Sequence, residues 1–188
     1  MPRENMTRYA VLGLLTTECR TGYDMKQMID RSLNHFWKIS FGQVYPMLRT
    51  LEAEGLIHQV EDNDRKAYEL TSTGHDELRQ WIAEEPDTLP VQRNELLLKL
   101  FFARHETMEQ TISKITHHER LLRERLKTYK AIETMIQASD SHSPDAVYWL
   151  LTLDYGKRQT NALMEWCEAA VITLKGGGND GTQNGRPE

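Results

Sequence analysis

The stretch from residue 40 to residue 53 carries an unusual set of polar side chains. A helix there would turn about 100° per residue and so place them opposite its apolar residues. Amides and hydroxyls can hydrogen-bond base edges, and guanidinium and phenol groups can hold phosphates, so the set suits contact with DNA. With Ser40 at its start, this outer surface comprises Ser40, Gly42, Gln43, Tyr45, Pro46, Arg49 and Thr50.

This surface differs from an ordinary solvated helix surface, which is usually rich in Glu and Lys. Gly42 and Pro46 are poor helix formers, and both are slim enough to let a helix approach another surface closely. The alternative is a core helix with an unusual outer side. The stretch alone leaves both interpretations open.

The same stretch contains the signals that begin and end a helix. Ser40 and Gln43 have the S-x-x-Q spacing of a capping box. Gly55 stands where a helix end favours a residue that can adopt positive φ. Apolar residues recur at i, i+3, i+4 and i+7 and predict a buried stripe made of Val44, Met47, Leu48 and Leu51.

A short β-hairpin is predicted directly after this helix. Residues 56–61 and 66–70 have the pattern of strands, with a turn at 62–64 between them. Arg65 and Lys66 lie at or beside the tip of the hairpin. Basic residues at a hairpin tip are suited to phosphate contact.

Two helices are predicted before the opening stretch, over residues 7–18 and 23–33. Two helices followed by a hairpin form a winged helix-turn-helix, whose second helix enters the major groove. Gln43 and Thr50 would then reach base edges, and Gly42 and Pro46 would seat the helix closely. Phosphates would be held by Lys38, Tyr45, Arg49, Arg65 and Lys66, with Tyr23 and Arg8 as second-rank candidates.

The charge distribution is compatible with this hypothesis. The 188 residues carry a net charge of −5, which argues mildly against nucleic acid, but residues 1–50 hold seven basic against four acidic residues, a net of +3. The sequence shows no apolar run near the length of a membrane span and no signal peptide pattern. Cys19 and Cys167 have no metal-ligand spacing, so we expect reduced cysteines and a cytoplasmic protein.

Composition divides the chain into four parts. We expect a DNA-binding domain over residues 1–83 and a linker over 84–94, where two prolines stand among acidic residues. Residues 95–175 are predicted to be all helical. Residues 176–188 are rich in Gly, Asn and Asp, and we expect a disordered tail. The fold class is therefore mainly α, a winged helix-turn-helix with a two-stranded wing plus a helical dimerisation domain.

The helical part carries apolar stripes that need partners. A helix over 95–103 is apolar nearly all round and is expected to be buried. Two long helices, from Thr107 and from Ser143, carry narrow stripes that must pack in the same chain or against a second chain. The predicted dimerisation residues are Ile112, Ile115, Leu122, Leu126, Leu150, Leu153, Leu163 and Trp166.

Catalytic chemistry is poorly supported. The sequence has no Gly-rich phosphate loop, nucleophile elbow or paired-carboxylate motif, and no cofactor is expected. His117, His118 and Glu119 point to different sides of a helix and do not predict a metal site. Aromatic residues on the last helix are candidates for an effector pocket, with core or interface packing as the alternative: Tyr148, Trp149, Tyr155 and Trp166.

With these residues in place, the chain resembles the PadR family of bacterial transcriptional regulators. The resemblance runs in order from about residue 7 to residue 83, and the second half is similar to the larger subfamily. The segments that carry it are Val11–Leu15, Gly22–Asp24, Trp37–Leu48, Leu51–Ile57, Arg65–Thr71 and Gly74.

The resemblance implies a homodimeric winged-helix repressor that binds a palindromic operator in double-stranded DNA. It also implies a multi-helix dimerisation domain and release by a small, often aromatic, molecule. The acidic balance leaves an alternative open, namely a ligand-sensing or adaptor protein whose winged helix contacts another protein.

Overall fold

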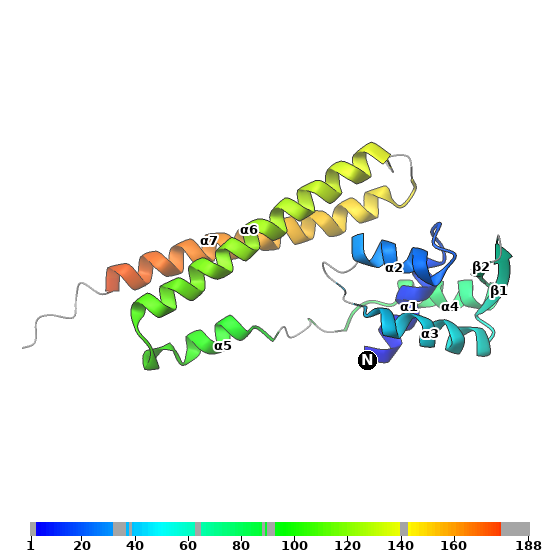
Figure 1. Cartoon of the computed structure of the whole chain (residues 1–188), viewed down its shortest axis with the longest axis horizontal. Coiled ribbons are helices and arrows are strands. Elements are labelled where there is room, and N and C mark those ends of the chain that lie inside the picture. The colour runs from blue at the N-terminus through cyan, green and yellow to red at the C-terminus, as the bar shows by residue number, and fades with distance from the viewer. Residues whose placement is uncertain are drawn as a thin grey trace, which may run out of the picture. The chain divides into compact units, whose positions relative to one another are not determined.

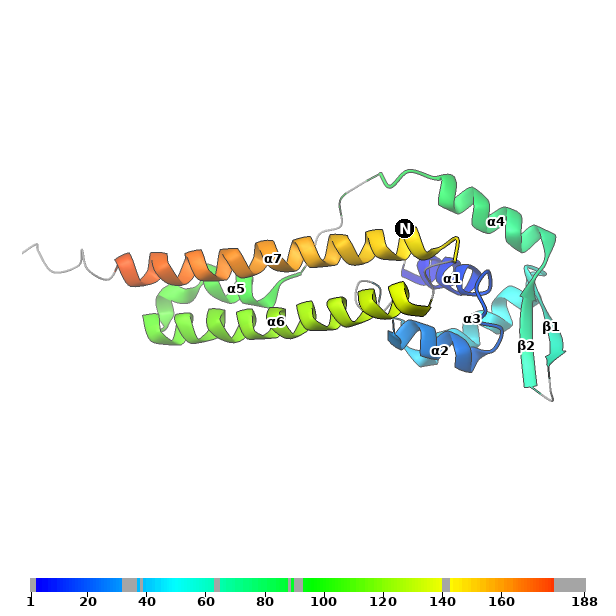
Figure 2. The same cartoon turned by 90° about the horizontal axis from the view of Figure 1, so that it is seen from above.

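The computed structural model describes residues 3–31, 37, 39–62, 65–87, 89, 93–139 and 143–177. The chain divides into two compact units, Met1–Pro90 and Val91–Glu188. Helices and one two-stranded antiparallel sheet make up the structure (Figure 1 and Figure 2), so the predicted mainly α class is confirmed. None of the helices in the described part of the chain combines the length and apolarity needed to span a lipid bilayer.

The first unit is a winged helix. Its elements are α1 (Arg3–Leu14), α2 (Gly22–Arg31), α3 (Phe41–Ala53), β1 (Ile57–Asp62), β2 (Arg65–Leu70) and α4 (Ser72–Ala83). Each of these elements contributes a buried side chain to one core, and β2 does so through Tyr68. The completely buried members are Val11, Leu12, Met25, Val44, Leu48 and Leu51.

Helix α3 begins and ends where its sequence signals predict. The Ser40 backbone N–H donates to Gln43 Oε1 at 2.9 Å, as a capping box requires. At the other end Gly55 has φ +73°, a value that L side chains rarely adopt. The Leu56 N–H then reaches back to the Leu51 carbonyl at 2.9 Å and closes the helix.

The wing is tied to the helices at both ends. Strands β1 and β2 pair from Ile57↔Leu70 to Asp62↔Arg65. The Tyr68 N–H donates to the Arg20 carbonyl at 2.8 Å, which fixes β2 beside the segment between α1 and α2. The position of the wing is thus set by backbone hydrogen bonds.

Helix α4 lies very close to the start of the wing. A Cβ at Gly74 would stand 2.0 Å from the Leu56 carbonyl oxygen, so glycine permits this approach. The helix is capped by Thr71, whose Oγ1 accepts from the Gly74 N–H at 3.1 Å. From the sequence alone, Thr73, Gly74, His75 and Asp76 predict a cap at Thr73, and the structure shows that this prediction is wrong. The Thr71 hydroxyl also donates to the Gly55 carbonyl at 2.8 Å, a tertiary contact that selects this threonine.

The second unit is all helical. It contains α5 (Glu95–Phe101), a 3-10 turn (Ala103–His105), α6 (Met108–Ser139) and α7 (Ala146–Gly177). The two long helices run side by side along their length (Figure 1 and Figure 2). Gly156 lets them approach, because a Cβ there would stand 2.9 Å from Cζ of Tyr129.

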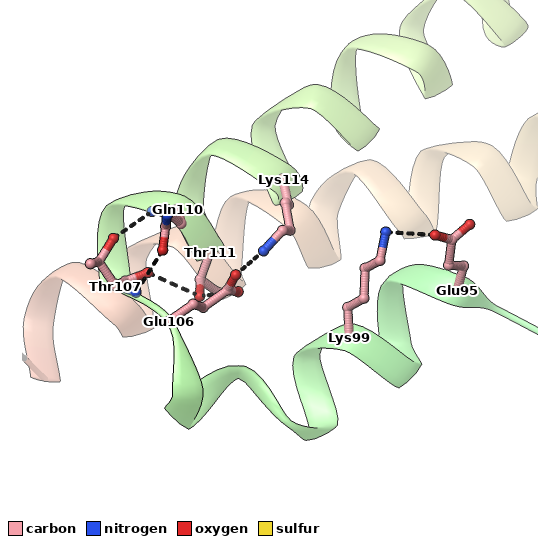
Figure 3. A network of polar contacts seen from close by, with 7 residues as sticks. All are labelled: Glu95, Lys99, Glu106, Thr107, Gln110, Thr111 and Lys114. Atoms are coloured by element: carbon pink, nitrogen blue, oxygen red, sulfur yellow. Dashed lines mark hydrogen bonds and ion pairs between the residues drawn. The ribbon is translucent and has the colours of Figure 1, made fainter.

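The start of α6 is held by polar contacts (Figure 3). The Thr107 N–H donates to Gln110 Oε1 at 3.0 Å, and the Gln110 N–H donates to Thr107 Oγ1 at 3.2 Å. Thr107 and Gln110 have the T-x-x-Q spacing from which the sequence predicts a capping box, and the structure confirms it. Glu106 accepts from the Thr111 hydroxyl at 2.8 Å and pairs with Lys114, which anchors the turn that precedes the helix.

Some boundaries differ from the sequence predictions. Helix α1 begins at Arg3 and ends at Leu14, not at 7 and 18, and Thr16 and Thr17 close it through hydroxyl bonds to the carbonyls of Gly13 and Leu14. Helix α7 extends through Gly177, so the first two residues of the expected tail are helical. The remaining tail, 178–188, and the predicted end of the second helix, 32–33, lie outside the described residues.

Candidate nucleic-acid interface

Helix α3 has two sharply different sides. Val44, Leu48 and Leu51 are completely buried, whereas the opposite side is exposed. The exposed residues include every predicted contact residue of this helix: Gly42, Gln43, Tyr45, Pro46, Arg49 and Thr50, with Ser40 before it. The predicted exposure of this side of the helix is therefore confirmed. Exposure alone does not decide between a DNA-facing surface and the alternative of a core helix with an unusual outer side.

The outer side of α3 is also physically open. A Cβ placed on Gly42 would meet nothing within 4 Å in the described part of the chain. Pro46 stands inside the helix and has no N–H to offer the Gly42 carbonyl one turn earlier. Packing inside the domain therefore does not require these residue types, which is consistent with a surface shaped for an outside partner.

Tyr45 is held in place by the backbone of a neighbouring helix. Its side chain is 43% exposed, and its ring lies over Gly22 at the start of α2. A Cβ at Gly22 would stand 2.7 Å from Cε1 of Tyr45. The lack of a side chain at Gly22 thus leaves the space that the Tyr45 ring occupies; we call this space the seat of Tyr45.

The start of α2 presents a second phenol. Tyr23 is exposed in the first turn, next to the buried Gly22. The Thr21 hydroxyl donates to Asp24 Oδ2 at 2.7 Å, and the Asp24 N–H donates back to Thr21 Oγ1 at 3.1 Å. This reciprocal cap fixes the turn that carries Tyr23.

Arg49 is exposed on α3, and within the described residues no carboxylate lies within ion-pair distance of it. It stands near the buried ring of Tyr68 on β2. Burial and the charge of Glu52 raise the pKa of Tyr68, and Arg49 acts in the opposite direction. The guanidinium is thus available for an external anion.

The basic residues of the wing stand opposite acidic residues in the backbone register of β1 and β2. Register places Lys66 opposite Glu61 and Arg65 opposite Asp62. Lys66 is exposed, and the side chain of Arg65 lies outside the described part of the structure, as does all of Lys38. The wing therefore contributes less net positive charge than its basic residues alone suggest.

Arg8 has a different place from the one predicted. Its Nε donates to Glu77 Oε1 at 2.5 Å, its second nitrogen donates to Glu77 Oε2 at 3.1 Å, and a third bond goes to Glu54. These carboxylates, Glu77 first, raise the pKa of Arg8. The guanidinium thus joins α1 to α4 and to the end of α3, and phosphate binding by Arg8 is not supported.

At the start of α3 and within it, the side chains of three predicted contact residues form hydrogen bonds. Gln43 Oε1 accepts from the Ser40 N–H at 2.9 Å and from the Ser40 hydroxyl at 2.8 Å. The Thr50 hydroxyl donates to the Pro46 carbonyl at 3.1 Å. Parts of these polar side chains are therefore already committed before any partner binds.

The predicted dimerisation residues lie mostly between α6 and α7 of one chain. Ile115, Leu122 and Leu153 are buried, while Trp166 is 37% exposed. The others are half-buried: Ile112, Leu126, Leu150 and Leu163. Within one chain these stripes therefore serve as each other's partners.

Exposed apolar side chains lie in two places in the second unit, on α5 and on the first turns of α7. Helix α5 has no buried residue, so the expectation that it is enclosed is wrong for a single chain. Only one side of this helix packs against the long helices, through Leu100. The exposed apolar residues are Leu97, Leu98, Phe101 and Phe102 from this segment and Val147, Tyr148, Leu151 and Tyr155 from α7. The sequence predicted that α5 is apolar nearly all round, but none of these eight residues was among the predicted dimerisation residues, and only Tyr148 and Tyr155 were candidates for the effector pocket.

The four aromatic residues proposed for an effector pocket do not share one environment. Trp149 packs against the buried cluster around Tyr129, whereas Tyr148 and Tyr155 are mostly exposed. A shallow hollow of about 430 Å³ lies elsewhere, near Glu106, Gln110 and Lys114 at the start of α6. Within one chain, the outer side of α7 thus carries aromatic surface and not an enclosed site.

The remaining titratable groups offer little chemistry. Burial raises the pKa of the Cys19 and Cys167 thiols, which keeps them protonated. Within the described ranges, no three His, Cys, Asp or Glu side chains gather closely enough to hold a metal ion.

The first unit is a winged helix in which α3, the second helix of the helix-turn-helix motif, is exposed, and the second unit is helical. This is the architecture of a DNA-binding transcriptional regulator. Residues 11–80 match the model of the transcriptional regulator PadR-like family, and residues 92–175 match that of the virulence activator alpha C-terminal domain. The chain belongs to the PadR-like family, in the form that carries this C-terminal domain. Members of this family are regulators and not enzymes.

Several relatives match over nearly their whole length. The negative transcriptional regulator PadR of Bacillus subtilis is 26% identical over 176 residues, covering 89% of this chain and 96% of the relative. The crystal structure of B. subtilis PadR in complex with operator DNA matches with a TM-score of 0.77 and 25% identity, covering 90% and 99%. The Vibrio cholerae virulence activator AphA matches with a TM-score of 0.73 and 25% identity, covering 90% and 98%.

Proposed function

We propose that this protein is a homodimeric repressor that binds a palindromic operator through the outer side of α3. The observation that carries the proposal is the exposed set of small, amide, phenol and guanidinium groups on a helix whose other side is fully buried. Operator binding by a relative with the same fold supports it. The regulator would act in the cytoplasm, where operator DNA is accessible.

Each contact residue has a role in this proposal. Gln43 and Thr50 read base edges, and Gly42 and Pro46 let the helix seat deeply in the major groove. Phosphates are held by Tyr45 and Arg49 on α3, Tyr23 on α2 and Lys66 on the wing, together with Lys38 and Arg65. Because only a few of these groups are cationic, few counterions are released and non-specific affinity is weak.

In this proposal the dimer forms through the exposed apolar residues of α5 and of the first turns of α7. Exposed apolar groups of this kind are covered most simply by a second copy. Among the earlier candidates, Ile112, Ile115, Leu122, Leu126, Leu150, Leu153 and Leu163 then pack mainly within one chain, and Trp166 is partly exposed. A two-fold dimer requires half-sites about 10 bp apart, or a multiple of one helical turn.

Repression and its release complete the proposal. A relative described as a negative regulator supports repression, although another is described as an activator. A small aromatic molecule that binds beside Tyr148, Trp149, Tyr155 and Trp166 would release the DNA if it binds the free dimer more tightly than the DNA-bound dimer.

Titration of the full chain against an operator selected from random DNA tests the proposal. Arg49→Ala should weaken binding and reduce the slope of log affinity against log salt by about 1.8 for the dimer, at about 0.9 per phosphate contact. Arg79→Ala serves as a matched control, because Arg79 is equally exposed but lies on α4 in an ion pair with Asp76. An unchanged affinity and salt slope for Arg49→Ala would show that the interface is misassigned.

A further inference from the structure

Gln43 has two roles, one in the capping box of α3 and one on the exposed side of that helix. It is the third residue of the capping box that begins α3, and it is exposed on the side of α3 assigned to DNA. Its carbonyl oxygen receives the Ser40 N–H at 2.9 Å and the Ser40 hydroxyl at 2.8 Å. The capping box therefore restricts which atoms of the Gln43 amide can contact DNA.

The orientation of this amide is chemically determined. A backbone N–H can only donate, so its partner in the side chain must be the oxygen of Gln43 and not the nitrogen. That oxygen has two lone pairs, and the two Ser40 donors use both. Turning the amide over would leave the Ser40 N–H without its acceptor and undo the start of the helix.

The amide nitrogen is uncommitted. Within the described part of the chain, nothing accepts a hydrogen bond from Gln43 Nε2. The side chain therefore presents two N–H donors and no acceptor to a partner.

We propose that Gln43 reads DNA as a donor only. It would recognise a base that offers an acceptor in the major groove, namely guanine through N7 or O6, or thymine through O4. It would not make the usual bidentate contact of glutamine with adenine, because that contact needs the carbonyl oxygen to accept from adenine N6. This inference rests on the proposed binding of operator DNA by α3.

Affinity measured for all four bases at each operator position tests the inference. The wild-type chain, Gln43→Ala and Gln43→Glu are compared on the operator selected by the full chain. Glutamate retains an acceptor for both Ser40 donors and so preserves the cap, but it has no hydrogen to donate. Circular dichroism confirms that the variants keep the fold.

At one symmetric pair of positions, the wild-type chain should prefer guanine or thymine by about tenfold, and both variants should lose that preference. Replacing the preferred base by an analogue that lacks its acceptor, such as 7-deazaguanine, should weaken the wild-type chain and leave Gln43→Ala unaffected. Together these results would establish donor-only reading.

Three outcomes would overturn the inference. The first is a Gln43-dependent preference for adenine that disappears with purine, the analogue without the N6 amino group. The second is a preference for the acceptor base that survives in Gln43→Glu. The third is an unchanged base preference at every position in Gln43→Ala. Failure of the proposed function has a different signature, since the wild-type chain would then select no DNA sequence even at low salt.

Discussion

Replacing Gly22 by alanine should displace the Tyr45 ring without harming the domain. The new Cβ would stand 2.7 Å from Cε1 and 2.9 Å from Cζ of Tyr45, whereas ordinary contact begins at 3.4 Å. The ring must therefore retreat by about 0.7 Å. Because the ring is the end of a flexible side chain, it is the ring that moves and not the helix. Alanine is also a better helix former than glycine by up to about 1 kcal/mol.

The cost falls on DNA binding. A hydroxyl bonded to a charged phosphate oxygen contributes about 1.5–3 kcal/mol. A displacement of this size should remove a large part of that bond, about 1 kcal/mol per half-site. A symmetric dimer has two such sites, so the affinity should fall by about 2 kcal/mol, or about thirtyfold in Kd.

Fluorescence anisotropy with the selected operator measures this loss, and thermal unfolding provides the control for stability. Tyr45→Phe removes the hydroxyl alone and should produce a loss of similar size. In the double variant the two losses should not add, because both act on one contact. The salt slope should stay constant throughout, since a neutral phenol displaces no counterion.

Two results would refute the reasoning. Wild-type affinity in Gly22→Ala would show that the seat of Tyr45 does not matter for binding. Fully additive losses in the double variant would show that Gly22 acts through something other than the Tyr45 hydroxyl.

Three further predictions concern the framework around this surface. Arg8→Met should lower the free energy of unfolding in urea by about 1–2 kcal/mol, because the half-buried Glu77 and the exposed Glu54 lose their shared cation; an unchanged value would show that the network is unimportant. Gly156→Ala should destabilise the protein by about 1–3 kcal/mol through contact with Tyr129, whereas Gly176→Ala, which meets open space, should not. Phe101→Glu should convert a dimer into a monomer in light scattering, and a dimer that persists would place the interface elsewhere.

Local signals predicted the fold of the first unit well. The capping box at Ser40, the positive φ at Gly55 and the apolar stripe of α3 depend on residues close in sequence, and the structure confirms all three. The cap of α4 was misplaced because Thr71 and Thr73 are locally equivalent. The hydrogen bond from the Thr71 hydroxyl to the carbonyl of Gly55, sixteen residues away, favours Thr71 over Thr73 as the cap.

The functional surface was predictable only in part. Helical periodicity identified which side of α3 is exposed, but it could not show how that side is arranged. The seat of Tyr45 on Gly22 and the engagement of Arg8 by Glu54 and Glu77 join residues far apart in the chain. Periodicity likewise could not separate stripes that pack within α6 and α7 from those left exposed, because both are apolar.

The arrangement of this surface bears on how the regulator separates its operator from other DNA. Arg49 is exposed, but the register of the wing places Lys66 opposite Glu61, and the whole chain carries a net charge of −5. Non-specific attraction to phosphates is therefore small. In the proposed complex, specific binding then depends on contacts with a fixed geometry, and two of the proposed contact residues, Tyr45 and Gln43, touch neighbouring residues of the same domain. Gly22 sets the position of the Tyr45 ring, and Ser40 sets the orientation of the Gln43 amide. Because these side chains are already ordered, binding loses little of their conformational entropy. A weakly charged surface can thus be selective when its few polar groups are held in place before the DNA arrives.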